Sequence, residues 1–350
     1  MTAIDFAMIG SGWRSEFYLR VAQALPDRFR VAGLVTRDAG KGATIASQWG
    51  IATWRNIDEM LRAATPAFVV VSVPPSAAPT VIKQLAGRGQ TVLTETPPAM
   101  TREGMEELAE LAQTGARIQV AEQCSFQPLQ AARLAVIASG RLGDPTFAHL
   151  SYYHGYHATG LLRRFLGVGH APATITARAF EADIVEGPGR GGWPEHERIV
   201  RSRQIRAELD FGGKLASYDF TGDQYFSPIR SVGALIRGSR GELHDLDLRY
   251  LEDFRTPIQL SLVRQDAGAT GNLEGLWHKG YLAGAEWIYR NPFPGARLSD
   301  DEIALATLLA GMCTYVEQGD EIYPLKEGIR DQFLSLAIEE AVRTGAPVIA

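Results

Sequence analysis

The sequence predicts an α/β protein of two domains. Residues 1–122 are expected to form a doubly wound parallel sheet, and residues 123–350 an α/β domain with a large, open, mostly antiparallel sheet. The length of 350 residues corresponds to about two domains at roughly 150 residues each. Up to about residue 122, short apolar segments alternate with amphipathic segments, which is typical of right-handed βαβ units. Beyond that residue, several alternating strand patterns follow one another without helices between them, which favours an antiparallel sheet.

The N-terminal domain is predicted to begin with an apolar strand at Ile4–Ile9 and a turn at Gly10–Ser15. A segment of helical periodicity follows at Glu16–Leu25 and ends before Pro26, because proline cannot continue a helix. The segment Arg30–Thr36 has the pattern of the next strand.

The rest of this domain continues the alternation of strand and helix. Almost every residue of Ala67–Val73 is β-branched or apolar, as in a strand that is buried on both faces of a parallel sheet. The next expected elements are a helix, a strand, a helix and a strand, at Ser76–Gly87, Gln90–Thr94, Thr101–Gln113 and Arg117–Ala121.

The second domain is predicted to contain helices at Pro128–Ser139 and near Ala158–Leu166, with the strand Thr146–Tyr153 between them. The further strands of its sheet are expected at Ala173–Phe180, Gln204–Phe211, Lys214–Phe220, Ser231–Arg237 and Glu242–Leu248. Alternation of apolar and polar residues is the signal for each of them.

Two helices are predicted near the C-terminal end of the chain. Ser299 and Glu302 form a capping box ahead of an apolar helix that extends to about Glu317. A second, amphipathic helix is expected at Glu327–Arg343, before Gly345. Although these helices belong to the second domain in sequence, they can pack against the first domain.

Composition excludes several classes of function. The chain has 35 basic and 40 acidic side chains, a net charge of −5 and a pI near 5.9, whereas a general nucleic-acid or anionic-membrane binder needs a basic surplus. No apolar stretch approaches the roughly 18 residues of a membrane span. Cys124 and Cys313 lie far apart without a CxxC motif, so neither disulfides nor a thiolate zinc site is expected. We expect a soluble protein of a reducing cytoplasm.

The turn after the first strand carries a glycine motif that is typical of dinucleotide binding. Gly10 allows a tight turn, Gly12 lets backbone N–H groups approach a pyrophosphate, and Ser15 is small enough for close packing of helix on strand. The following helix N-terminus adds partial positive charge. The residues expected to bind this part of the cofactor are Gly10, Ser11, Gly12, Trp13 and Arg14.

The end of the second predicted strand bears on the choice of cofactor. NAD-preferring proteins place a carboxylate there to accept both ribose hydroxyls, but this chain has Thr36 followed by Arg37. A hydroxyl and a guanidinium can bind a 2′-phosphate that a carboxylate would repel. We therefore predict NADP(H), with NAD(H) as the alternative if the strand ends later and Asp38 accepts the ribose.

Several segments together resemble one family. These are the glycine motif, Val73–Ser76, Glu95-Thr96-Pro97, the turn at Ile236–Glu242 and the segment from Tyr323 to Ala341. With them the chain resembles the Gfo/Idh/MocA-type oxidoreductases over nearly its whole length. The resemblance implies an N-terminal Rossmann domain and a second domain that binds sugar, polyol or related cyclic substrates. It also implies that Pro74 and Glu95 contact the cofactor.

The catalytic residues depart from the pattern of the family. The resemblance implies a Glu-Lys-Pro tripeptide with a catalytic lysine, and an Asp and a His four residues apart at the start of a helix. Here Thr96 stands in place of that lysine, and His157 takes the histidine position with Tyr153 in the place of the Asp. His170 fits less well, because Pro172 follows it directly. The predicted catalytic residues are thus His157, Tyr153, Thr96 and Glu95.

Other side chains near this motif are candidates for substrate binding. They are His154, Tyr156, Arg163, Arg164 and Trp193. One of the two arginines could supply the positive charge that the missing lysine would bring to a developing alkoxide. The alternative interpretation of the Tyr/His cluster is an aromatic strand end packed in the core. His154 and His157 have a spacing that suits a metal, but no convergent acid is visible, so no metal is expected.

The function predicted from the sequence is hydride transfer between a nicotinamide cofactor and a carbohydrate-like alcohol or ketone, with His157 and Tyr153 handling the proton. Two alternatives remain open: an NAD-assisted glycoside hydrolase or lyase, and a nucleotide-binding sensor without turnover. Lys214–Phe220 and Ser231–Arg237 carry apolar residues on both alternations. The open sheet face is therefore predicted to form a homodimer or homotetramer.

Overall fold

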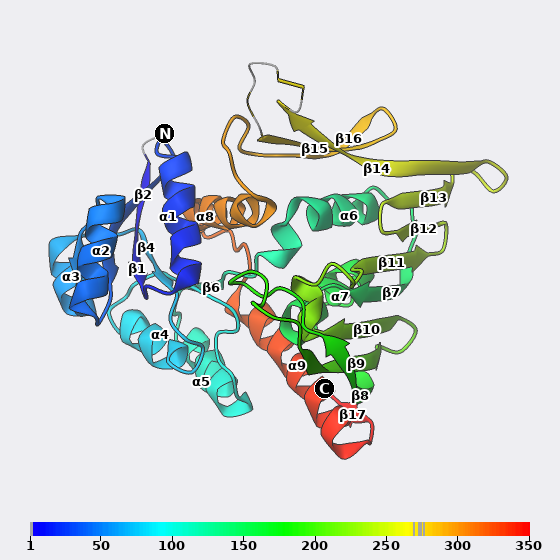
Figure 1. Ribbon diagram of the computed structural model, residues 1–350, viewed down its shortest axis with the longest axis horizontal. Coiled ribbons are helices and arrows are strands. Elements are labelled where there is room, and N and C mark those ends of the chain that lie inside the picture. Colours follow the sequence, from blue (N-terminus) through cyan, green and yellow to red (C-terminus); the bar gives the residue numbers. More distant parts are fainter. Residues whose placement is uncertain (1–2, 269, 272–274, 276) are drawn as a thin grey trace. The chain divides into compact units, whose positions relative to one another are not determined.

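The structure is a computed structural model that describes residues 3–268, 270–271, 275 and 277–350 (Figure 1). The chain divides into two compact units. The first unit comprises Met1–Gln130, Gln265–Gly280 and Arg290–Ile329. The second comprises Ala131–Arg264, Tyr281–Tyr289 and Arg330–Ala350.

The first unit contains a parallel sheet with the strand order β3-β2-β1-β4-β5-β6. Its strands are β1 (Ile4–Ile9), β2 (Phe29–Val35), β3 (Thr53–Trp54), β4 (Phe68–Val71), β5 (Val92–Thr94) and β6 (Ile118–Val120). The predicted doubly wound sheet is confirmed. The chain reverses its direction of winding between β1 and β4, and ligands of such sheets bind at the carboxyl ends of the strands at this point.

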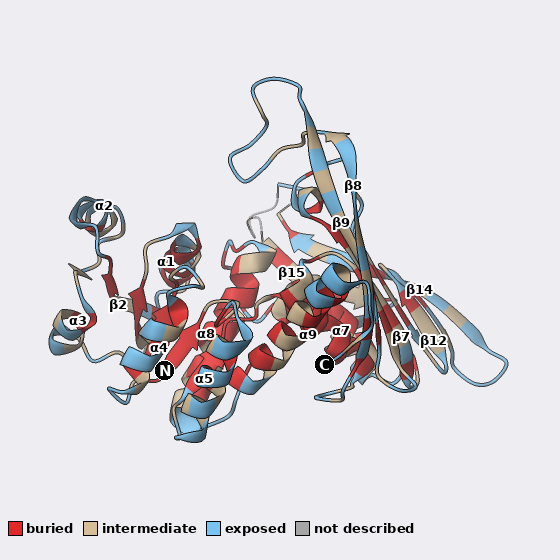
Figure 2. Cartoon of the chain, turned by 90° about the horizontal axis from the view of Figure 1, so that it is seen from below, coloured by how far each residue is buried: buried red, intermediate tan, exposed pale blue. Residues whose placement is uncertain are grey.

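Helices surround this sheet and complete the core of the unit. They are α1 (Trp13–Ala24), α2 (Ala39–Trp49), α3 (Ile57–Ala63), α4 (Ala78–Ala86), α5 (Arg102–Gln113) and α8 (Asp300–Gln318), with the short helix η1 (Cys124–Phe126). Helix α8 begins at the predicted capping box, where Ser299 accepts a hydrogen bond from the backbone N–H of Glu302. It packs against α1, and both helices contribute buried residues to one core with β1 (Figure 2). The elements α2, α3 and β3 were not among those predicted.

The second sheet has the strand order β16-β15-β14-β13-β12-β11-β7-β10-β9-β8-β17 among the residues that the structure describes. Strands β7 and β10 pair in parallel, whereas their other neighbours pair antiparallel. The strands are β7 (Pro145–Ser151), β8 (Thr174–Val185), β9 (Ile199–Asp210), β10 (Leu215–Thr221), β11 (Gly233–Gly238), β12 (Gly241–His244), β13 (Asp247–Leu251), β14 (Pro257–Ala267), β15 (Trp277–Ala283), β16 (Glu286–Arg290) and β17 (Val348–Ile349). The predicted large, mostly antiparallel sheet is confirmed.

One predicted strand of this sheet is wrong. The segment Glu242–Leu248 is two antiparallel strands, β12 and β13, joined by a tight turn. Asp245 lies in that turn with φ +52°, in the left-handed region that short polar side chains tolerate better than branched ones. The apolar residues on either side of it hide the turn when only alternation is considered.

Three further helices complete the chain: α6 (Pro128–Ala138), α7 (Gly155–Leu166) and α9 (Leu325–Thr344). Helix α7 begins three residues earlier than predicted, so His157 lies in its first turn. It packs on β7 and β10. A Cβ atom on Gly155 would lie 2.6 Å from Ser335 Oγ of α9, so a larger residue here would require the Ser335 hydroxyl to turn away.

Within the described part of the chain, no helix has the length and apolar character needed to cross a membrane.

Candidate active site

The glycine motif forms the predicted turn between β1 and α1. Gly10 has φ +114°, and a Cβ atom there would lie 2.0 Å from the carbonyl oxygen of Ser72. Gly12 is the N-cap residue of α1, brings no capping side chain, and faces open space. Ser15 Oγ donates to Gly10 O at 3.1 Å and to Ser72 Oγ at 3.2 Å, which ties α1 to the ends of β1 and β4. These features fit a dinucleotide, since an uncapped helix start is left open to an anion.

The end of β2 has the residues on which the cofactor prediction depends. The strand ends at Val35, and buried Thr36 follows, with its hydroxyl 2.9 Å from Ser11 Oγ. Arg37 is exposed. Asp38 is the N-cap residue of α2, where its carboxylate accepts a backbone N–H at 2.9 Å. The Asp38 carboxylate thus has a structural task at the start of a helix.

Arg55 is a second cation next to the end of β2, and it was not predicted from the sequence. Its Nη1 donates to the carbonyl oxygens of Thr36 at 2.7 Å and Asp38 at 2.8 Å, and its Nη2 donates to Thr53 Oγ1 at 3.3 Å. It follows β3, an element too short to be recognised by its pattern, so no sequence signal indicated its place.

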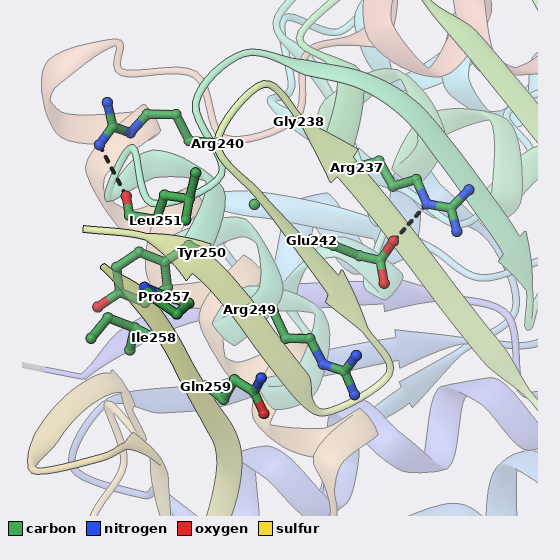
Figure 3. A pocket seen from close by; sticks show the side chains of 11 residues that line it. Arg237, Gly238, Arg240, Glu242, Arg249, Tyr250, Leu251, Pro257, Ile258 and Gln259 are labelled. Carbon is green, nitrogen blue, oxygen red and sulfur yellow. Dashed lines mark hydrogen bonds and ion pairs between the residues drawn. The ribbon is translucent and has the colours of Figure 1, made fainter. Parts of the chain in front are cut away.

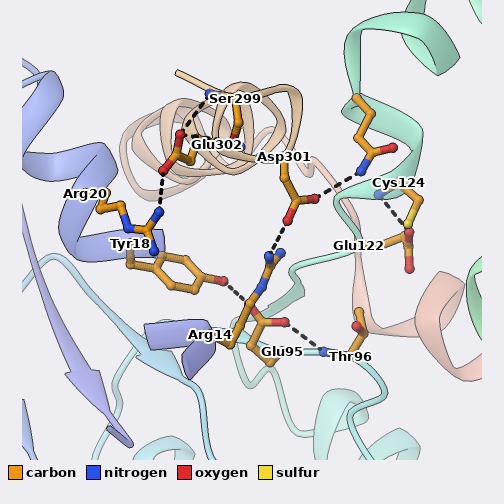
Figure 4. Close-up of polar contacts among 11 residues, drawn as sticks. Arg14, Tyr18, Arg20, Glu95, Thr96, Glu122, Cys124, Ser299, Asp301 and Glu302 are labelled. Atoms are coloured by element: carbon orange, nitrogen blue, oxygen red, sulfur yellow. Dashed lines mark hydrogen bonds and ion pairs between the residues drawn. The ribbon is translucent and has the colours of Figure 1, made fainter. Parts of the chain in front are cut away.

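Glu95, which follows β5, is the centre of a partly buried polar cluster (Figure 4). Its Oε1 accepts from Arg14 Nε at 3.1 Å and from Tyr18 Oη at 2.5 Å. Arg14 Nη1 donates to Asp301 Oδ2 at 2.7 Å. Thr96 donates its backbone N–H to Glu95 Oε2 at 3.4 Å. Of these residues, Tyr18 and Asp301 were not predicted.

The charged groups of this cluster shift the pKa values of Arg14 and Tyr18. Burial lowers the pKa of the Arg14 guanidinium, but the Glu95 and Asp301 carboxylates outweigh it and hold this pKa above its usual range. Burial, together with the Glu95 carboxylate, raises the pKa of Tyr18 well above its usual value. Arg14 is therefore a permanent cation, and Tyr18 a neutral donor, at any pH at which the protein is used.

Pro74 lies in the turn between β4 and α4. It is exposed, and its carbonyl oxygen accepts from the backbone N–H of Ala77 at 2.8 Å. This turn follows the strand next to β1, so Pro74 lies at the carboxyl edge of the sheet, like the glycine motif.

The predicted catalytic histidine lies in the second unit, at the start of α7. His157 is 7% exposed, and its ring centroid lies 4.5 Å from that of His154, 5.3 Å from that of Tyr156 and 6.3 Å from that of Tyr153. Tyr153 and Tyr156 are buried, while His154 is exposed. The structure therefore brings four of the predicted residues of this unit together between the end of β7 and the first turn of α7.

Tyr225 belongs to the same cluster and was missed by sequence reasoning. It lies in the short helix η2 (Gly222–Tyr225) after β10. Its hydroxyl accepts the backbone N–H of His154 at 3.0 Å, and the two rings are 6.3 Å apart. It joins the cluster only because β10 and β7 pair in parallel, which places the ends of both strands side by side.

Arg163, which was predicted to bind substrate, is instead bound to Asp331 and Gly169. Its Nη1 donates to buried Asp331 Oδ1 of α9 at 2.5 Å, and Nε and Nη2 both donate to Gly169 O, at 2.8 and 2.6 Å. These contacts hold α7 to α9, and we do not include Arg163 in the substrate site. Arg164 is half-buried, and Trp193 is 69% exposed in the loop between β8 and β9. His170 is exposed beyond the end of α7.

A surface hollow of about 390 Å³ lies over β11, β12, β13 and the start of β14 (Figure 3). Two of its arginines are bound within the hollow: Arg237 Nε donates to Glu242 Oε2 at 2.6 Å, and Arg240 Nη2 donates to Leu251 O at 3.0 Å. It contains none of the predicted site residues, and we do not assign it to the site.

Residues 4–122 match the family model described as an oxidoreductase family with an NAD-binding Rossmann fold. This segment is therefore similar to the NAD-binding domains of that family. Over these residues the chain is similar to the Gfo/Idh/MocA family, so the resemblance stated from its motifs is confirmed for this segment.

Comparison with known proteins extends this result. An uncharacterized oxidoreductase of Schizosaccharomyces pombe, C115.03, is 30% identical over 117 residues, which are 33% of this chain and 32% of that protein. The aligned segment thus spans about a third of this curated relative.

Two solved structures share the fold over almost the whole chain. An NAD-binding oxidoreductase from Klebsiella pneumoniae is 18% identical, with 99% of each chain covered and a TM-score of 0.71. A levoglucosan dehydrogenase in complex with NADH and levoglucosan is 14% identical, with 99% of each chain covered and a TM-score of 0.71. At these identities the likeness establishes the fold of both units and no more.

Proposed function

We propose that this protein is a nicotinamide-dependent dehydrogenase that interconverts an alcohol and a ketone on a carbohydrate-like or polyol substrate. The observation that carries the proposal is the turn at Gly10–Gly12, which requires glycine for its backbone and opens onto an uncapped helix start. The NADH and levoglucosan of the similar dehydrogenase support the classes of cofactor and substrate.

Residues of the first unit would hold the cofactor. The backbone at Gly10–Arg14 would bind the pyrophosphate, and Thr36 with Arg37 would bind the adenosine ribose and its 2′-phosphate. The role of Asp38 as a helix cap supports a preference for NADP(H) over NAD(H). The chemistry supplied by a bound nicotinamide is the acceptance or donation of hydride at its C4 atom.

Proton handling is assigned to the cluster at the start of α7. A neutral imidazole at His157 accepts the hydroxyl proton of an alcohol substrate as the alkoxide forms, and returns it in the reverse direction. The rings of Tyr153 and His154 both lie next to this imidazole, with centroids 6.3 Å and 4.5 Å from it. His154 is exposed, so it can pass a proton between His157 and solvent. Tyr156 is buried, and its ring centroid lies 5.3 Å from that of His157.

A panel of sugars, polyols and glycosides tests the proposal, with absorbance at 340 nm and product chromatography as parallel readouts. His157→Gln should lower turnover by about 10² or more, as for the loss of a general acid–base group, with cofactor affinity unchanged. His170→Gln is the matched control and should have little effect. Elimination products without net change at 340 nm would replace the dehydrogenase by an NAD-assisted lyase or hydrolase. Cofactor binding without turnover of any compound would favour a sensor.

We also propose that the protein self-associates as a homodimer or homotetramer through the outward face of its second sheet. Burial alternates along β10, and the residues of its outward face, such as Leu215 and Ser217, are only half-buried in a single chain. Both cysteines are free thiols, which supports a reducing, cytoplasmic setting.

A further inference from the structure

The guanidinium of Arg14 is bound at two of its nitrogens and not at the third. Nε donates to Glu95 at 3.1 Å and Nη1 donates to Asp301 at 2.7 Å. Nη2 is buried and meets no hydrogen-bond acceptor among the residues that the structure describes. The residue as a whole is 9% exposed. A buried donor without an acceptor is destabilising, and in folded proteins nearly every such donor finds one.

The two carboxylates that hold Arg14 are themselves fixed. Glu95 Oε1 also accepts from Tyr18 Oη, and Asp301 Oδ1 accepts from Gln127 Nε2 at 3.0 Å. Arg14 is therefore clamped between the end of β5 and the first turn of α8 (Figure 4). A guanidinium is a rigid planar fork, so fixing Nε and Nη1 also fixes the direction in which Nη2 points.

The position of this clamp in the sheet indicates which part of a dinucleotide it faces. Thr36 and Arg37, at the end of β2, belong to the adenosine side of the sheet. Arg14 lies in the first turn of α1, directly after the central strand β1, and its side chain reaches Glu95 at the end of β5, in the opposite direction. The nicotinamide half of a dinucleotide lies on this opposite side of a doubly wound sheet.

The segment after β6, on the same side of the sheet, also contains buried polar atoms that lack a hydrogen-bond partner among the described residues. Gln123 Oε1 and Ser125 Oγ are buried and have no hydrogen-bond partner within the described ranges. Gln127 of the same segment binds Asp301. The part of the first unit beyond β5 and β6 thus presents a donor and acceptors whose partners the described chain does not supply.

Charge limits the kind of oxygen that Arg14 can bind. One guanidinium and two carboxylates leave the cluster with a net charge of one negative unit, which disfavours a phosphate oxygen. A neutral oxygen does not meet this repulsion. A net negative cluster also suits the positively charged ring of an oxidised nicotinamide. We propose that Arg14 Nη2 donates a hydrogen bond to a neutral oxygen of the nicotinamide riboside half of the cofactor, either the carboxamide oxygen or a ribose hydroxyl.

This inference rests on the proposed function, because it requires a nicotinamide cofactor. Calorimetric titration of the full chain with NADH and with ADP-ribose, which lacks the nicotinamide, tests it. Arg14→Met should weaken NADH by about tenfold or more, as expected for a hydrogen bond from a charged donor, and leave ADP-ribose near the wild-type affinity. Arg20→Met is the matched control. Arg20 lies on the same helix, pairs with Glu302 at 3.6 Å, and is about half exposed; its loss should change neither affinity.

The thionicotinamide analogue of NADH distinguishes the two possible oxygens, because its carbonyl oxygen is replaced by a sulfur that accepts weakly. If the carboxamide oxygen is the acceptor, the wild type should bind the analogue more weakly than NADH, and Arg14→Met should bind both alike. If a ribose hydroxyl is the acceptor, Arg14→Met should weaken both ligands by the same factor. Either result supports the proposal.

Arg14→Lys provides a second variant should Arg14→Met fail to fold. It keeps a cation between the two carboxylates and removes the second terminal nitrogen, so it should also lose affinity for NADH and not for ADP-ribose. Equal loss of both ligands, or loss of neither, in the folded variant would overturn the inference while leaving the proposed function intact. A wild-type protein that binds ADP-ribose and NADH equally would also overturn it. Failure of the wild type to bind either ligand would reject the proposed function itself.

Discussion

Arg37 at the end of β2 is expected to set the choice between the two nicotinamide cofactors. A guanidinium that binds a phosphate group contributes about 1.5–3 kcal/mol. Arg37 is exposed, so solvent and salt reduce this contribution, and we use about 1.4 kcal/mol, which corresponds to a tenfold change in affinity. Arg37→Ala should therefore lower the NADPH:NADH affinity ratio about tenfold, chiefly through weaker binding of NADPH.

Calorimetric titration with both cofactors measures this ratio directly and needs no substrate. Asp38→Ala tests the competing assignment. Because Asp38 caps α2, its loss should lower the free energy of unfolding by about 1 kcal/mol and leave the ratio unchanged. Arg30→Ala removes an arginine from the other end of β2, where it pairs with Asp5, and serves as the control. Higher ionic strength should weaken NADPH more than NADH in the wild type, since the 2′-phosphate adds charge.

An unchanged ratio in Arg37→Ala would show that Arg37 does not bind the 2′-phosphate. A selective loss of NADH affinity in Asp38→Ala would make Asp38 the ribose ligand and the protein NAD-preferring. Together these outcomes would refute the inference from Thr36 and Arg37.

Three further predictions concern the second unit. Arg163→Met should lower the free energy of unfolding, measured in urea, by about 3–5 kcal/mol, because it leaves the buried Asp331 carboxylate without its cation. The double variant Arg163→Met with Asp331→Leu should recover part of this loss. Additive losses would contradict the ion-pair explanation. Burial lowers the pKa of His149, so protonation of this imidazole is less favourable in the folded than in the unfolded protein. Its contribution to the free energy of unfolding is therefore present above the unfolded pKa of about 6.5 and is lost as the pH falls below it. His149→Gln should flatten the dependence of the free energy of unfolding on pH, and an unaltered slope would exclude His149 as its source. Light scattering at micromolar concentration should show a dimer or tetramer, and a monomer would reject the proposed interface.

Features that depend only on neighbouring residues could be predicted from the amino-acid sequence. The Gly10 turn, the capping box at Ser299 and Glu302, and the strand pattern of Ala67–Val73 are local signals. Steric limits on φ, unsatisfied N–H groups at a helix start and burial on both faces of a strand act within a few residues. They suffice to predict the parallel sheet, the glycine motif and the helix that Ser299 caps.

Contacts between side chains that are distant in sequence depend on how the elements pack. Asp301 is 287 positions from the Arg14 that it binds, and Tyr225 is 71 positions from His154; no periodicity connects such residues. For the same reason the sequence assigned Arg163 to the substrate, although it is bound by Asp331 of α9. A buried charge must find a partner, but only the packing of the elements determines which carboxylate lies within reach.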